Sequence, residues 1–457
     1  MNKGILGSIA ALLVSTGMIW SQPPAPGGPG SMDQAPPPPY HGMDGGGMDG
    51  HGDWQPNGDL QPNNGAFPGL PPLWIRGEWM LWHLKPMQQP VPLITTSGAD
   101  SFGIIGNPTT TILFGGTGNI DYHDFTGGRL SGGLYLCCDP NLGLEVSAFT
   151  TEKQTTGFSA VSDPNGNPVI ARPFFDVISG TENAIAVSFP GAFAGSVNAF
   201  DSAQFWGGDM SVTLGWNCTS WLTATVLGGF MYREFDEQLQ VSQFSVILPL
   251  GTAQVGGTTF TAPNGIAIQD NFDTRNQFYG GLIGARLEAH YGRLSAEFTE
   301  KFGIGATHQI VGIQGLTTGV APPVTTPGNQ LSNTFPSLFP PVITLSNGLT
   351  TVPGGILATS TNSGQHVNTT FSVASESTVN LKLKVTKCIT VMAGYTFLYL
   401  NKVVRPGTEI DRNVNQAGVP VSPAFTNFIV FPKSPTFSFN EGNIWANGVS
   451  AGLQIDF

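Results

Sequence analysis

Residues 445–457 read WANGVSAGLQIDF and alternate along their whole length between two kinds of side chain. Every second residue from Trp445 to Phe457 is apolar except Asn447, and the residues between them are small or polar. Successive side chains of a β-strand point to opposite faces. The segment therefore predicts a strand with one apolar face and one polar face.

The same alternation recurs in nine further segments. They lie at 74–84, 127–136, 142–152, 204–216, 220–234, 276–290, 293–305, 371–385 and 388–400. With 445–457 they give ten predicted strands, each at least about as long as the ~9–11 residues that cross a bilayer when tilted.

Short and long connections alternate strictly between these strands. The short ones lie at 137–141, 217–219, 291–292 and 386–387, and the long ones at 86–126, 153–203, 235–275, 306–370 and 401–444. Unstructured loops beyond ~12–15 residues are uncommon in compact soluble domains. Long loops on one side and short turns on the other are typical of outer-membrane barrels.

We therefore predict an all-β fold for 73–457: an antiparallel, up-and-down transmembrane β-barrel with long extracellular loops and short periplasmic turns. The strand number is about ten, or twelve if 184–200 or 241–250 adds a hairpin within a long loop. Alternatively, these two segments simply extend strands above the membrane. The final Phe457 resembles the C-terminal signal by which such barrels are recognised for assembly, which makes the outer-membrane assembly machinery an expected partner.

The low charge content fits this architecture. Asp, Glu, Lys and Arg make up 11% of the 457 residues, against roughly 25% in an ordinary soluble domain. A soluble β-sandwich also alternates, but its polar face meets water and tends to be rich in charge. The net charge of −12 argues against nucleic acid as a partner, because phosphate binding requires clustered Lys and Arg.

The N-terminus indicates export. A short basic start at Lys3 precedes the apolar run 5–19, and the small residue Ser21 follows it. This layout predicts a signal peptide over 1–21, cleaved on the way to the outer membrane, because the run is too short for a spanning helix. Residues 22–72 are rich in Pro and Gly and lack Lys and Arg, which predicts a disordered periplasmic segment.

Within 22–72, soft Met and His ligands could bind copper. They are His41, Met43, Met48 and His51. We favour a solvated linker, and expect no cofactor and no metal.

The alternation within the predicted strands places nine charged residues on the face that is expected to line the lumen. They are Arg76, Glu78, Glu145, Arg286, Glu288, Glu297, Lys301, Glu376 and Lys382. An eight-stranded barrel is filled by side chains, whereas 16-stranded porins leave a channel. Ten strands lie near the filled end, so we favour a structural ion-pair network over a lining that selects solutes.

All four cysteines, Cys137, Cys138, Cys218 and Cys388, lie at the predicted periplasmic turns. The periplasm permits disulfides, and neighbouring turns make a bond between Cys137 or Cys138 and Cys218 plausible. We select Cys138–Cys218 as the candidate, with inert thiols as the alternative.

Three places carry His as a candidate general base: His83, His123 next to Asp124, and His308, all expected near the extracellular rim. No nucleophile elbow, P-loop or zinc-protease motif is present. We expect that the protein is not an enzyme.

Several motifs carry a resemblance to a known family. They are WIRGE at 74–78, FPGAFAGS at 189–196, DTRNQFYGG at 273–281, and VRPG at 404–407 followed by IDR at 410–412. In these, 73–457 resembles the putative beta barrel porin-7 family. The resemblance implies a barrel in the outer membrane, but it brings no established catalytic or substrate-binding residues.

The sequence thus predicts an integral outer-membrane protein of the cell envelope whose first partner is the lipid bilayer. The leading functional hypothesis is porin-like passage of small solutes. The alternative is a closed barrel that displays large surface loops for adhesion or envelope structure.

Overall fold

The computed structural model describes residues 72–116, 118–136, 139–320, 350–426, 428 and 431–457. The predicted signal peptide, nearly all of the Pro- and Gly-rich segment, Cys137 and Cys138 lie outside them. Within the described residues, no helix has the length and apolar composition that crossing a bilayer needs.

Ten antiparallel strands form a closed ring, which confirms the predicted barrel and its strand number. They are β1 (Leu73–Leu84), β6 (Asp124–Leu136), β7 (Asp139–Thr151), β11 (Phe193–Thr219), β12 (Leu222–Ile247), β15 (Gly265–Tyr291), β16 (Leu294–Val320), β18 (Gly364–Lys384), β19 (Ile389–Val404) and β21 (Glu441–Asp456). The ring closes at β1, which pairs with β21 on one side and with β6 on the other.

The outward positions of the lower ring form an apolar belt. Trp79, Val226, Ile283 and Leu453 are examples of large apolar side chains exposed there. Apolar side chains can face outward in such numbers because they meet lipid, and the alternation turns the polar positions of each strand inward.

Aromatic rings mark both edges of the belt. Trp206, Tyr232 and Tyr279 lie side by side at the upper edge, with ring centroids 5.1 and 5.0 Å apart. Trp221 and Tyr291 are exposed beside the periplasmic turns. Such rings favour the boundary between hydrocarbon and water.

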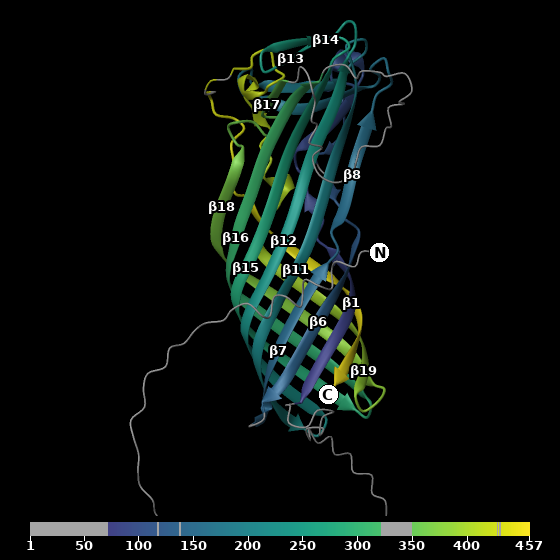
Figure 1. Cartoon of the computed structure of the whole chain (residues 1–457), viewed down its shortest axis with the longest axis vertical. Helices are drawn as coiled ribbons and strands as arrows, with labels where there is room; N and C mark the ends of the chain where they lie inside the picture. The colour runs from purple at the N-terminus through teal and green to yellow at the C-terminus, as the bar shows by residue number, and fades with distance from the viewer. Residues whose placement is uncertain (1–71, 117, 137–138, 321–349, 427, 429–430) are drawn as a thin grey trace, which may run out of the picture. The chain divides into compact units, whose positions relative to one another are not determined.

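The wall is higher on one side of the ring. β11, β12, β15 and β16 have 26 or 27 residues each, whereas β1 and β6 have 12 and 13. Figure 1 shows these long strands rising to the top of the molecule, above the belt. Residues 193–200 and 241–247 lengthen β11 and β12 instead of adding strands to the ring. The strand β8 (Gln154–Val161) joins the upper part of β11.

The described parts of the long loops contain further strands, which the sequence did not predict. Three of these loops supply a second sheet in the order β10-β9-β3-β4, to which β20 is added. Its strands are β3 (Pro92–Ser97), β4 (Thr111–Gly115), β9 (Val169–Asp176), β10 (Thr181–Ser188) and β20 (Asn413–Val414). We call it the inner sheet, because its side chains share one core with the inward side chains of the wall.

The remaining elements are short. They are β2 (Met87–Gln88), β5 (Asn119–Ile120), β13 (Thr252–Val255), β14 (Thr258–Thr261), β17 (Thr350–Pro353) and the 3₁₀ turns η2 (Ala99–Ser101), η3 (Pro406–Thr408) and η4 (Gln416–Gly418).

Candidate functional site in the barrel lumen

The lower lumen holds a network of charged side chains that includes all nine residues predicted from the sequence. Arg286 contacts both carboxylate oxygens of Glu145 at 2.7 Å. Arg76 lies 3.4 Å from Glu297, and Lys382 pairs with both Glu297 and Glu288. These contacts come from β1, β7, β15, β16 and β18, so they connect strands from several sides of the ring.

A second half of the network contains three residues that the sequence reasoning missed. Glu376 lies between Arg129, at 2.7 Å, and Arg233, at 2.5 Å. Asp209 lies between Arg233, at 3.3 Å, and Lys301, at 2.7 Å. The alternation within their own strands could have found all three, because each one occupies an inward position next to an outward residue such as Leu130, Met210 or Tyr232.

The network is balanced and leaves little free space. Six bases (Arg76, Arg129, Arg233, Arg286, Lys301 and Lys382) meet six acids (Glu78, Asp209, Glu145, Glu288, Glu297 and Glu376). Glu78 accepts a hydrogen bond from the Ser450 hydroxyl, 3.3 Å away. The cavity that these side chains line is about 40 Å³, room for roughly three water molecules.

An aromatic layer lies directly above the charges. The rings of Trp82, Phe149 and Phe205 have centroids 5.1 to 6.5 Å apart. The guanidinium groups of Arg129 and Arg233 lie 5.8 and 5.2 Å from the centroid of the Phe149 ring. Cation–π attraction therefore joins the charged network to the aromatic layer.

The inner sheet is the third layer, and Asp270 of β15 fixes it to the wall. The Asp270 side chain is fully buried and lies 2.5 Å from Arg172 of β9. Its carboxylate also accepts hydrogen bonds from the backbone N–H groups of Ile356, Leu357 and Ala358. A Cβ atom at Gly355 would lie 2.0 Å from the Asp270 Oδ1 atom, so only glycine fits there.

Arg405 fixes the last long loop in the same way. It donates to both oxygens of Glu237, at 2.7 and 2.5 Å, and to the carbonyls of Lys85 and Pro86, both at 2.9 Å. The side chain of Asn276 on β15 pairs with the backbone N–H and C=O of the preceding residue, Val404. The lumen is thus filled at three successive levels.

Asp201 of β11 is a fully buried acid beside this anchor. Neither of its carboxylate oxygens has a hydrogen-bond partner within the described residues. Arg405 itself is paired with Glu237. Burial, together with the Glu237 charge, raises the pKa of Asp201 to about 8.

We predict from this shift that stability falls as pH rises. An unfolded Asp has a pKa of about 3.9, so between about pH 4 and pH 8 the folded chain keeps a proton that the unfolded chain has lost. The free energy of unfolding then drops by up to about 1.4 kcal/mol per pH unit and levels off above the folded pKa. Urea unfolding in detergent across this range measures the slope.

Asp201→Asn is expected to make the slope shallower, because the variant has no proton to lose. The matched control is Asp121→Asn, a change at an exposed carboxyl in the loop before β6, which should leave the slope unchanged. Equal slopes for wild type and Asp201→Asn would contradict the prediction.

The other residues selected from the sequence lie apart from this network. Cys218 and Cys388 are exposed and are not bonded to each other. Because Cys138 is outside the described residues, its bond to Cys218 stays a prediction. The backbone N–H of Phe457 donates to the Leu73 carbonyl at 2.8 Å, where the ring closes. Its role in assembly also stays a prediction.

His83 and His308 lie on the outer face of the wall, and His123 lies in the loop before β6. Asp124 lies 3.4 Å from His83, on the neighbouring strand, and not against His123, its neighbour in sequence. His308 bonds to Thr369 halfway along β16, so the expected position at the rim is wrong. Among the described residues, no three His, Cys, Asp or Glu side chains are grouped to hold a metal ion.

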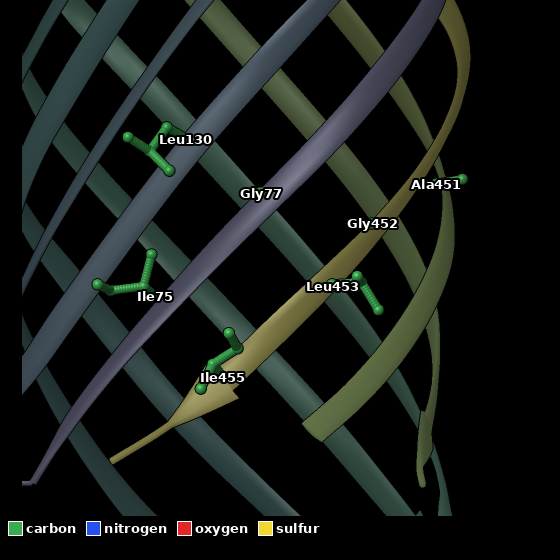
Figure 2. A pocket seen from close by; sticks show the side chains of 7 residues that line it. All are labelled: Ile75, Gly77, Leu130, Ala451, Gly452, Leu453 and Ile455. Atoms are coloured by element: carbon green, nitrogen blue, oxygen red, sulfur yellow. The ribbon is translucent and has the colours of Figure 1, made fainter. Parts of the chain in front are cut away.

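Figure 2 shows a shallow apolar depression on the outer face, where β21, β1 and β6 meet. Ile75, Leu130, Leu453 and Ile455 surround it, and Gly77 leaves the gap, since nothing lies within 4 Å of a Cβ at that position. Within the belt, such a depression faces lipid chains.

A closed ring of ten antiparallel strands, with an apolar outer belt and a charged interior, defines a transmembrane β-barrel of the outer-membrane type. The chain belongs to the putative beta barrel porin-7 family, whose model matches residues 74–335 and 340–457. This confirms the family resemblance found in the motifs.

Solved structures with a similar arrangement share little sequence with this chain. The outer membrane protease OmpT from Escherichia coli is 9% identical, with 84% of this chain and 97% of that chain covered and a TM-score of 0.34. The toluene transporter TodX from P. putida is 10% identical, with 84% and 89% covered and a TM-score of 0.20. No curated protein matches the chain.

Proposed function

We propose that this protein is a closed outer-membrane barrel that anchors its extracellular half at the cell surface, and that it is neither an open porin nor an enzyme. One observation carries the proposal: the lumen is filled by the charged network, the aromatic layer and the inner sheet. A porin needs a continuous aqueous channel, and about 40 Å³ among the charged side chains is far too little for a solute.

The balance of charge supports the same proposal. A channel that selects ions is lined by an excess of one sign, whereas here six acids and six bases share the lumen, and five of the acids contact bases directly. The tall strands β11, β12, β15 and β16 meanwhile carry the wall far above the belt. That upper half suits surface display, for adhesion or envelope structure.

Reconstitution of the refolded chain into planar bilayers tests the proposal. We expect no conductance steps at neutral pH over the whole voltage range, because a cavity of about 40 Å³ among the charged side chains has no room for a stream of hydrated ions. A folded, heat-modifiable band on an unboiled gel shows that the barrel has formed, and a known open porin in the same bilayers serves as the positive control. Reproducible steps from folded protein would refute a closed barrel and restore the porin hypothesis.

A further inference from the structure

The apolar belt contains one exception. Glu300 is the one acidic or basic side chain among the described outward positions of the belt. These positions lie in 73–81, 126–136, 142–150, 206–216, 222–232, 279–291, 294–306, 371–385, 389–399 and 445–455.

Glu300 lies within the belt and not at its edge. On β16 the exposed apolar side chains Phe302 and Ile304 lie above it, and Phe298 and Leu294 lie below it. Across the β15–β16 pair, Glu300 faces Ala285, whose outward neighbours include the exposed Ile283. Lipid headgroups are therefore beyond its reach, and hydrocarbon offers a carboxyl group no hydrogen bonds.

Two serines of β18 complete a small polar patch. Glu300 pairs in register with Ser377, whose hydroxyl donates to the Glu300 Oε2 atom. Ser375 pairs with Phe302 and faces outward on the same side. Within the described residues, the Ser375 hydroxyl makes no hydrogen bond. The patch thus presents one free acceptor, the Glu300 Oε1 atom, and one free donor.

We infer that Glu300, Ser375 and Ser377 form the centre of a contact between two copies of this chain within the bilayer. A two-fold contact brings the same patch together twice. The Ser375 hydroxyl of one copy then donates to Glu300 of the other, and the reverse bond forms by symmetry. The apolar side chains around the patch close the contact against lipid.

Self-complementarity favours a second copy over another protein. A partner that offered Lys or Arg would satisfy the carboxylate but would leave the Ser375 donor without an acceptor. In the two-fold contact, by contrast, the free donor and the free acceptor satisfy each other. The inference requires only that the belt faces lipid, so it holds whether the lumen is closed or open.

Association of the full chain in lipid vesicles tests the inference. The measurement is single-molecule photobleaching over a series of protein-to-lipid ratios. We expect wild type to reach a two-step population as density rises. Glu300→Leu is expected to raise the dissociation constant at least tenfold, because it removes both intermolecular bonds. The matched control Thr150→Leu, an outward polar change four strands away around the ring, should associate like wild type.

The stability of the monomer separates association from a merely structural role. Removing a carboxyl group from the lipid face should leave the unfolding midpoint of the Glu300→Leu monomer unchanged or higher. If Glu300 only holds Ser377 in place within one copy, the unfolding midpoint of the Glu300→Leu monomer falls and its self-association is unaffected. Wild type that stays monomeric at every density also overturns the inference. Should Glu300→Leu fail to fold, Ser375→Ala carries the test, with an expected several-fold weaker association.

Discussion

Asp270→Ala is expected to lower the free energy of unfolding by roughly 3–5 kcal/mol, because it breaks a buried ion pair from one side. Arg172 is 1% exposed and would keep its charge without a carboxylate. The backbone N–H groups of Ile356, Leu357 and Ala358 would also lose their acceptor. Urea unfolding in detergent measures the loss, and limited proteolysis of the unheated variant should show cleavage in the inner sheet.

Asp273→Ala is the matched control, because it removes a carboxylate three residues further along the same strand. Asp273 faces the outside of the wall, where its carboxylate accepts a hydrogen bond from the Asn271 side chain. Loss of such a partly exposed contact is expected to lower the free energy of unfolding by less than about 1 kcal/mol. If the two variants lose equal stability, the carboxylate of Asp270 does not anchor the inner sheet.

Glu376→Ala is the second change with a large expected effect. It is expected to lower the free energy of unfolding by roughly 3–5 kcal/mol. Its carboxylate serves two cations at once, and Arg129 has no other ion-pair partner among the described residues. Among the described residues, Arg233 would keep one ion-pair partner, Asp209 at 3.3 Å. We expect a lower urea midpoint for the folded barrel and a lower temperature at which its heat-modifiable band disappears.

Glu288→Ala separates this effect from a general sensitivity of the lumen. Glu288 belongs to the same network, but its side chain is 23% exposed, and its partner Lys382 keeps Glu297. Glu288→Ala is therefore expected to lower the free energy of unfolding by about 1 kcal/mol or less. If Glu376→Ala also lowers the free energy of unfolding only slightly, the charged residues line a passage and do not stabilise the barrel wall.

The barrel could be predicted from the sequence because its main signal is local. Alternation such as that of 445–457 has a period of two residues, so it assigns each side chain to a face without knowledge of any partner strand. The nine lumen charges followed from it, and the same rule applied to 127–136, 204–216 and 220–234 would have added Arg129, Asp209 and Arg233. Alternation also continues through 235–247, so the extension of β12 above the membrane could be partly predicted from the sequence.

The filling of the upper lumen could not be predicted from the sequence. Asp270 meets Arg172 across 98 positions of the chain, and Arg405 meets Glu237 across 168. No spacing rule relates residues so far apart, and long loops without alternation gave no reason to expect the inner sheet. His83 and Asp124 illustrate the same limit, since strand register alone made them neighbours.

The sequence by itself determined that this chain crosses the outer membrane as a barrel of ten or twelve strands and that nine charged residues of the strands face inward. Only the tertiary structure decided that the loops fold back into the barrel. It also placed Glu300 and the two serines of β18 together on the lipid face. The physical reason is that alternation along a single strand decides which face of the barrel each side chain occupies. The filling of the lumen and the contacts between side chains depend instead on segments that only the closed ring brings together.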